Sequence, residues 1–321
     1  MGQSLEVRRH SLDLLPAVES ARDFAAKARA ENTCRSYASD FGHFQQWCSD
    51  HGLADLPAAP ETVAVYLSDG ATRLGLKPST LARRIVSIRH MHRLAGHDDP
   101  TRHPGVGEVW KGIRRELTEA PDQKAAITVA QLRQMLSALP DTKRGYRDRA
   151  LLLVGFAGGF RRSELVAINM GDLRFEPDGV TITVRRSKTD PTGRGRAVGI
   201  ALGHDRLTCP VRNLESWIAA SEIDRGAVFR RMHRGDIVGT DRLRPASVAT
   251  TVKFAAASAG LDPKLVAGHS LRSGFVTTAA RNNQPEWAIM RQTGHRSHAT
   301  VRRYIQDVTA LRDSPSRHLG L

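Results

Sequence analysis

Residues 268–304 read GHSLRSGFVTTAARNNQPEWAIMRQTGHRSHATVRRY and contain the most informative motifs of the chain. Among the side chains of this stretch that can bind, donate to or attack a phosphate are His269, Arg272, His295 and Tyr304. One His-x-x-Arg tetrapeptide is uninformative, because 13 His and 40 Arg (48 basic residues less eight Lys) predict about 1.6 of them by chance. The chain contains two, so only a wider pattern can be informative.

Two upstream motifs extend the pattern. Residues 158–165, GGFRRSEL, place Arg161 three residues before Glu164, and residues 187–190, SKTD, place Lys188 just beyond a strand pattern. The ordered set resembles the tyrosine recombinases, the phage integrase family that has Cre-like and Xer-like members. The resemblance covers nearly the whole chain.

This resemblance implies a catalytic set with Tyr304 as the nucleophile: Arg161, Lys188, His269, Arg272, His295 and Tyr304. Glu164 has a supporting role. The implied reaction is site-specific recombination of double-stranded DNA at specific recombination sites. A 3′-phosphotyrosyl bond forms, the 5′-hydroxyl of a partner duplex attacks it, and two rounds pass through a Holliday junction in a homotetramer. Because the phosphotyrosyl bond retains the energy of the broken bond, no metal, nucleotide or other cofactor is expected.

The residue types suit this chemistry by themselves. In-line displacement at a phosphodiester concentrates negative charge on the non-bridging oxygens, which the forked guanidiniums of Arg161 and Arg272 can hold. The imidazoles of His269 and His295 can donate to those oxygens or accept the tyrosine proton. Tyr304 follows two arginines, whose positive field can activate a weak nucleophile.

Lys188 is the expected general acid, because a departing 5′-alkoxide needs a proton and an arginine, with its pKa above about 12, is a poor donor. An exposed turn lysine is the alternative. Tyr37 and Tyr66 lie in apolar helical patterns and fit a core, and Tyr146 has no histidine near it in sequence. A capping aromatic on the last helix is the alternative for Tyr304.

The net charge of +15 favours a polyanionic partner, because clustered basic side chains displace counterions from phosphates. Residues 1–126 carry 17 Lys+Arg against 16 Asp+Glu, net +1, whereas residues 127–321 carry 31 against 17, net +14. Coding bias explains the arginine excess equally well. No run of about 18 apolar residues, signal peptide or cysteine metal motif is present, so we expect a cytoplasmic, nucleoid-associated protein with no membrane contact.

Hydrophobic periodicity predicts a mainly α protein of two domains. Helical patterns fill residues 32–48, 60–67 and 78–94, and periodicity is lost between Arg114 and Ile127. A buried helix at 148–157 and a small antiparallel sheet of residues 180–184 and 197–202 follow, and the chain from Arg212 onward is expected to be mostly helical. Together with the resemblance, this predicts four segments: an N-terminal extension 1–15, a helical SAM-like core-binding domain 16–113, a linker 114–120 and a mostly helical catalytic domain 121–321. The two domains are expected to clamp the duplex.

A basic stripe opposes the apolar face of the helix that follows Pro78. It contains Arg83, Arg84, Arg89 and Arg93, and no acidic residue occurs between Asp69 and Asp98. Such a stripe is either a solvated face or a phosphate contact. We assign these four arginines to DNA binding as a hypothesis.

Two other functions stay open. A type IB topoisomerase uses similar chemistry on one duplex, and paired-site dependence and tetramer formation would discriminate. A non-catalytic DNA-binding accessory protein is the second, although a complete catalytic set argues against it. Gly268 before His269 resembles Cre-like members, so the subfamily is open. The apolar tail with Leu319 and Leu321 is expected to dock on a neighbouring subunit, as tails in this family do.

Overall fold

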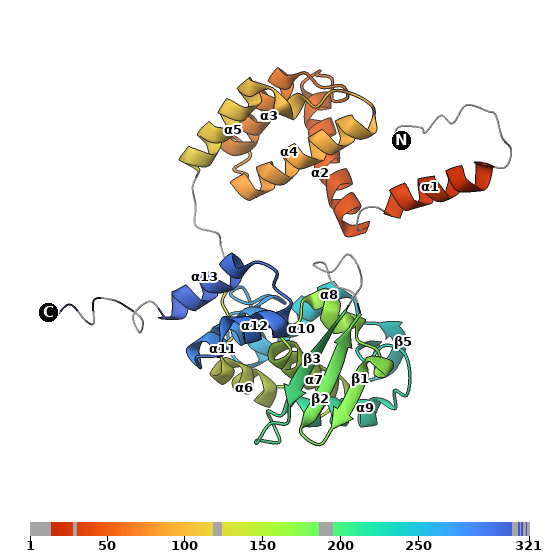
Figure 1. The fold of residues 1–321 in the computed structure, drawn as a ribbon, viewed down its shortest axis with the longest axis vertical. Coiled ribbons are helices and arrows are strands. Elements are labelled where there is room, and N and C mark those ends of the chain that lie inside the picture. Colours follow the sequence, from red (N-terminus) through yellow and green to blue (C-terminus); the bar gives the residue numbers. More distant parts are fainter. Residues whose placement is uncertain are drawn as a thin grey trace. The chain divides into compact units, whose positions relative to one another are not determined.

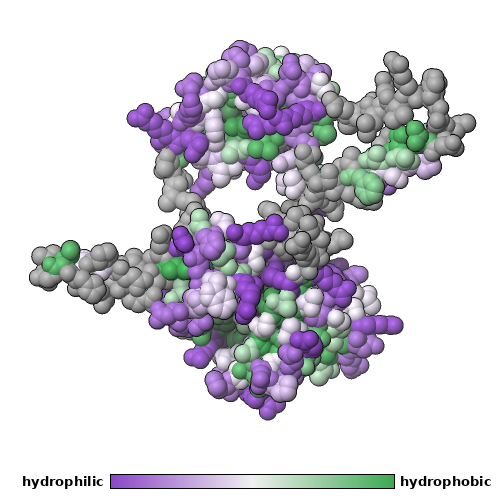
Figure 2. Space-filling view, viewed as in Figure 1, coloured by the Kyte–Doolittle hydropathy of each residue, from purple (hydrophilic) through white to green (hydrophobic). Residues whose placement is uncertain are grey.

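The structure is a computed structural model that describes residues 14–27, 31–117, 124–185 and 195–309, together with residues 314, 316 and 319. The chain divides into two compact units, residues 1–121 and 122–321, and each has its own hydrophobic core. Both are mainly helical (Figure 1). Figure 2 shows hydrophilic side chains over much of the visible face of each unit. Within the described ranges, no helix is long and apolar enough to cross a bilayer.

The first unit is helical throughout its described part. Its elements are α1 (Leu15–Lys27), α2 (Glu31–Asp50), α3 (Pro60–Thr72), α4 (Pro78–Leu94), a 3₁₀ turn (Pro100–Arg102) and α5 (Pro104–Glu116). Proline begins α3, α4 and α5, where its missing N–H has no intrahelical partner to lose and its φ is already helical.

An aromatic core joins α2 to α3. The ring of Tyr66 lies 4.9 Å from that of Phe44 and 5.2 Å from that of Trp47, both edge-on, between ring centroids. Tyr66 is fully buried, as expected for a core tyrosine. Ile113 and Leu117 extend the same core, so α5 continues three residues into the range that we expected to be linker.

The second unit combines helices with two small antiparallel sheets. Its elements are α6 (Val129–Ser137), α7 (Lys143–Ala157), α8 (Arg162–Ala167), a 3₁₀ turn (Met170–Asp172), β1 (Leu173–Glu176), β2 (Gly179–Val184), β3 (Arg196–Ala201), α9 (Pro210–Ser221), β4 (Arg230–Met232), β5 (Val238–Arg242), α10 (Pro245–Ser258), α11 (Ser270–Arg281), α12 (Glu286–Thr293) and α13 (His298–Thr309).

The larger sheet has the strand order β1-β2-β3 (Figure 1). Its predicted pair is confirmed, because Val180 lies opposite Ile200 and Ile182 opposite Val198, all four buried. The chain after Arg212 is mostly helical, as expected, and β4 and β5 add one short hairpin to it. These strands are three and five residues long, too short to show a clear alternation.

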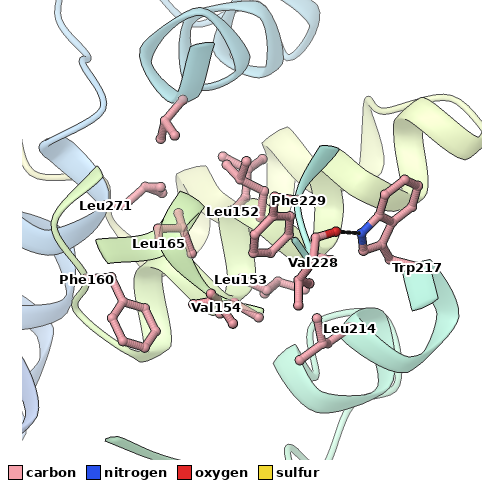
Figure 3. Close-up of a cluster of buried hydrophobic side chains, with 14 of the residues drawn as sticks. Leu152, Leu153, Val154, Phe160, Leu165, Leu214, Trp217, Val228, Phe229 and Leu271 are labelled. Atoms are coloured by element: carbon pink, nitrogen blue, oxygen red, sulfur yellow. Dashed lines mark hydrogen bonds between the residues drawn. The ribbon is translucent and has the colours of Figure 1, made fainter. Parts of the chain in front are cut away.

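The core of this unit fixes the segments that carry the expected site. Leu152, Leu153 and Val154 of α7 lie at its centre (Figure 3). Leu165 of α8 and Leu271 of α11 are buried in the same cluster. Leu165 follows Glu164 in the sequence, and Leu271 precedes Arg272. Packing of these two leucines in the core therefore sets the positions of Glu164 and Arg272 as well.

Candidate active site

Two glycines with left-handed backbones present carbonyl groups to the two expected arginines. Gly159 follows α7 with φ +57°, and Gly294 follows α12 with φ +68°, conformations that favour glycine at a helix end. The Gly159 carbonyl accepts a hydrogen bond from Nη1 of Arg272 at 2.7 Å, and the Gly294 carbonyl accepts one from Nη2 of Arg161 at 3.3 Å. Arg272 is therefore held by the loop that precedes Arg161, and Arg161 by the turn that precedes His295.

Arg272 lies in the first turn of α11 and is only 2% exposed. Its Nη1 donates a second hydrogen bond, 2.6 Å long, to the Thr293 carbonyl, and its Nη2 lies 2.9 Å from Nε2 of His295. These contacts use three of its five N–H groups, and all of the partners are neutral groups. Burial, and then the charge of Arg161, lowers the pKa of Arg272 to about 9. The site is therefore a buried cation suited to an anionic ligand.

His295 follows the end of α12 and is held at both ring nitrogens. Nδ1 lies 2.7 Å from Oγ1 of Thr293, and Nε2 faces Arg272. Burial, and then the positive charges of Arg272 and Arg161, lowers the pKa of His295 to about 3. The ring is therefore neutral over the physiological pH range.

His269 precedes α11 and is more exposed than His295. No hydrogen bond joins its ring to another residue in the described part of the chain. Partial loss of hydration, followed by the charges of Arg272 and Arg162, lowers its pKa. A neutral, accessible imidazole of this kind can accept a proton from a nearby group.

Glu164 is the buried centre of an ion-pair cluster. Its Oε1 lies 2.7 Å from Nη1 of Arg161, and its Oε2 lies 2.9 Å from Nη2 of Arg196. Oε2 also accepts the backbone N–H of Arg161 at 3.0 Å. Burial by itself raises the pKa of this carboxyl, but the hydrogen bonds and charges of the two arginines outweigh it and keep the pKa below its ordinary value. The carboxylate therefore stays ionised and orients Arg161.

Tyr304 lies on α13, which packs against α11 and α12. Its half-buried ring contacts a cluster that includes Val276 and Ile289. An ion pair fixes the start of α13, because Glu286 of α12 accepts from Nδ1 of His298 at 2.7 Å and from Nε of Arg302 at 3.3 Å. The helix that carries the expected nucleophile is thus docked on the helices that carry Arg272 and His295.

The structure brings together Arg161, Glu164, His269, Arg272 and His295 and packs the Tyr304 helix beside them. Lys188 lies outside the described residues, as does most of the tail after Thr309. Arg196 and Thr293 were missed in the sequence. Arg196 is one of 40 arginines and belongs to no quoted motif, and Thr293 stands in the TGH motif without a signal of its own.

The basic stripe of α4 is paired within its own unit. Arg83 makes a two-pronged ion pair with Asp40 of α2, with Nη2 2.9 Å from Oδ1. Asp99, just after α4, pairs with Nε of Arg89 at 3.1 Å and with Nη2 of Arg93 at 3.4 Å. Acidic residues before and after α4 in the sequence therefore neutralise part of the stripe.

Arg84 corrects the expectation of an exposed stripe. It is only 7% exposed, and its guanidinium lies over the Tyr66 ring at 5.7 Å from the centroid. Its Nε and Nη1 have no hydrogen-bond partner among the described residues. The side chain of Arg84 faces the core and does not lie on the outer face of α4 with Arg83.

Residues 125–310 match the phage integrase family, and residues 24–98 match the N-terminal SAM-like domain of phage integrases. The chain belongs to the phage integrase family. This tyrosine recombinase is 40% identical over 293 residues to the integrase/recombinase xerD homolog of Selenomonas ruminantium, which covers 90% of this chain and 85% of that protein. It is 24% identical over 322 residues to recombinase cre of Escherichia phage P1, with 94% of this chain and 90% of that protein covered. The predicted enzyme class, a site-specific DNA strand transferase, is confirmed.

Solved structures of tyrosine recombinases share the fold. The XerH site-specific recombinase in a post-cleavage complex with palindromic difH substrate has a TM-score of 0.58 at 16% identity, covering 87% of this chain and 79% of that chain. A lambda integrase dimer bound to a COC′ core site has a TM-score of 0.58 at 17% identity, covering 90% and 75%. The predicted fold class, a helical SAM-like domain and a mostly helical catalytic domain with small antiparallel sheets, is confirmed.

Proposed function

We propose that this tyrosine recombinase cleaves duplex DNA with Tyr304, forms a 3′-phosphotyrosyl bond, and exchanges strands between two specific sites through a Holliday junction. One observation carries the proposal: Arg161 and Arg272, held by the carbonyl groups of Gly294 and Gly159, converge with two imidazoles beside the helix of Tyr304. Two guanidinium groups beside a tyrosine nucleophile suit a phosphodiester as the ligand.

The arginines would stabilise the charge that develops during displacement. Arg272 is preorganised, because two carbonyl groups and an imidazole hold it before any ligand arrives. Arg161 is preorganised by Glu164 and Gly294. Groups fixed in this way need no reorganisation as the transition state forms, and their effect is strong in a buried site.

The proton transfers follow from the two histidine environments. The Nε2 lone pair of His295 already accepts from Arg272, so the more exposed His269 is the acceptor for the Tyr304 proton. The tyrosine oxygen then attacks phosphorus, the bond to the 5′ oxygen breaks, and Lys188 protonates that oxygen. Rejoining reverses each step. Protein and DNA together supply every proton and electron pair.

We assign the remaining parts of the reaction to the two domains and to assembly. The core-binding domain, residues 16–113, would contact the duplex, and the catalytic domain, residues 121–321, would carry out the chemistry, with both clamping the DNA. Two duplex sites and four active sites require a homotetramer on DNA, working at the nucleoid in the cytoplasm. The DNA present in the XerH and lambda integrase structures supports duplex DNA as the partner.

Covalent capture tests the proposal. The protein is incubated with sheared genomic DNA of its source organism, denatured in SDS, and the protein-linked 3′ ends are sequenced. We expect wild-type protein and a Tyr146→Phe control to give adducts at a defined sequence, and Tyr304→Phe to give none while still binding DNA. An adduct with Tyr304→Phe would show that the nucleophile is another residue.

The same mapped sequence separates recombination from topoisomerase-like activity. A plasmid with two copies of the sequence should yield recombinant circles, and a plasmid with one copy should yield none. Relaxation of supercoils on the one-copy plasmid, without recombinants from the two-copy plasmid, would favour the topoisomerase alternative.

A further inference from the structure

We propose that Thr293 is a positioning residue that fixes the tautomer of His295 and, through it, the orientation in which Arg272 meets the scissile phosphate. The inference deepens the proposed cleavage reaction and rests on it for its functional part. Its structural part concerns the protein without DNA and can be tested separately.

The direction of each hydrogen bond at Thr293 follows from the partners. Oγ1 lies 2.7 Å from the Ile289 carbonyl, one turn earlier in α12, and 2.7 Å from Nδ1 of His295. The hydroxyl has one hydrogen, and a carbonyl can only accept it. That hydrogen is therefore used on Ile289, and the hydroxyl oxygen must accept a hydrogen from Nδ1 of His295.

The opposite side of the imidazole gives the same assignment. A guanidinium has no acceptor, so Nη2 of Arg272 must donate to Nε2 of His295, which then carries a lone pair. Both ends of the ring agree on the Nδ1–H tautomer. The Thr293 carbonyl also accepts Nη1 of Arg272 at 2.6 Å. Thr293, His295 and Arg272 therefore form a closed ring of hydrogen bonds in which one residue holds the other two.

The alternative tautomer would disrupt this ring. With hydrogen on Nε2, two donors would face each other at 2.9 Å, and Nδ1 would turn a lone pair toward an oxygen that has already donated its hydrogen. The guanidinium would have to rotate away and give up its carbonyl partners.

The test compares three forms of the full chain: wild type, Thr293→Val, which keeps the shape and removes the hydroxyl, and Thr293→Ser, which restores the hydroxyl. Thr251→Val, a buried threonine of α10, is the matched control. The first readout is NMR of ¹⁵N-histidine-labelled protein without DNA, with the His295 signals identified by their loss in His295→Gln. We expect Nδ1–H in wild type, Thr293→Ser and Thr251→Val, and a shift toward Nε2–H in Thr293→Val.

The second readout is the single-turnover rate of adduct formation on a duplex with the mapped cleavage sequence. We expect Thr293→Val to slow this step on the order of tenfold with unchanged DNA affinity, because a buried imidazole donor loses its partner. Thr293→Ser should recover most of the rate.

Each deviating outcome has a defined meaning. Nε2–H in wild-type protein, or Nδ1–H retained in Thr293→Val, would overturn the inference, and the wild-type measurement holds even if Thr293→Val fails to fold. A Thr293→Ser variant as defective as Thr293→Val would assign the effect to the methyl group and overturn it too. A changed tautomer with an unchanged rate would refute the positioning role. If wild-type protein forms no adduct, the proposed function fails, while the tautomer result stands.

Discussion

Nη2 of Arg272 lies 2.9 Å from Nε2 of His295, and only one distribution of protons satisfies both groups. The guanidinium must donate and the imidazole must accept. Burial is the main cause of both pKa shifts, which lower the pKa of Arg272 to about 9 and that of His295 to about 3. The pair therefore carries a single positive charge at neutral pH, and this charge lies on the Arg272 guanidinium, the group proposed to bind the phosphate.

The first prediction concerns acid sensitivity. The pKa of His295 is about 3 in the folded protein against 6.5 for an unperturbed histidine, so between these values the unfolded chain binds the extra proton. Stability from this residue is full above about pH 6.5 and is lost as the pH falls toward about 3. Between pH 7 and pH 5, wild-type protein should lose about 1–2 kcal/mol more unfolding free energy than His295→Gln, measured by urea denaturation. Equal losses in both proteins would contradict the assignment.

The second prediction concerns the carboxylate between Arg161 and Arg196. Glu164→Gln leaves two cations close together without their shared anion, so unfolding free energy should fall by about 3 kcal/mol and adduct formation should slow. Arg196→Met should be milder, because Glu164 keeps its pair with Arg161. Urea denaturation and the single-turnover cleavage rate would compare the two variants. A slower cleavage rate for Arg196→Met than for Glu164→Gln would show that Arg196 itself contacts the DNA.

The third prediction revises the role of α4. Arg83, Arg89 and Arg93 remain accessible despite their ion pairs, whereas Arg84 is buried. Arg83→Gln, Arg89→Gln and Arg93→Gln combined should weaken DNA binding and lower the slope of log affinity against log salt by about one unit for each phosphate that is no longer neutralised. Arg84→Met is the control in the same helix and should leave the slope unchanged. A slope that is unchanged in the triple variant would leave α4 as a solvated face.

The α4 helix illustrates what a sequence can and cannot predict. Helices from Pro60 and Pro78 and the strand Val180–Val184 follow from local periodicity and capping, and all are present. Whether an arginine stripe is free depends on partners that only the fold supplies. Asp40 lies 43 residues before Arg83, and the Tyr66 ring that the Arg84 guanidinium covers belongs to another helix, α3.

The candidate site divides in the same way. Residues in ordered motifs could be predicted because several motifs together identify a family. Arg196 could not, since its importance comes from the β2–β3 register, which places it opposite Val184, and from its pair with Glu164. The proton positions on His295 were also out of reach, because they depend on the distances to Thr293 and Arg272.

The fourth prediction concerns Gly274, two residues after Arg272. A Cβ there would overlap the Ile127 carbonyl oxygen and lie 2.6 Å from the Phe156 ring. Gly274→Ala should therefore destabilise the protein by about 3 kcal/mol, measured by thermal or urea unfolding, because α11 must shift. Gly199→Ala is the control, since a Cβ at that position would meet nothing within 4 Å. Similar stability of the two variants would mean that α11 can move without cost.

The last prediction assigns the general acid to Lys188, which follows β2 and lies outside the described residues. A departing 5′-alkoxide is strongly basic and needs a proton, whereas a thiolate leaves without one. Lys188→Ala should therefore cleave ordinary DNA slowly and recover on a substrate whose bridging 5′ oxygen is replaced by sulfur.

Arg161→Ala is the matched control for this rescue. Its loss removes charge stabilisation at the non-bridging oxygens, which sulfur at the 5′ position does not restore, so it should stay slow on both substrates. The measurement is the single-turnover rate of adduct formation for each variant on each substrate. If sulfur rescues both variants equally, or fails to rescue Lys188→Ala, the proton comes from another group. His269 would then be the next donor to test, and the tyrosine proton would need a different acceptor.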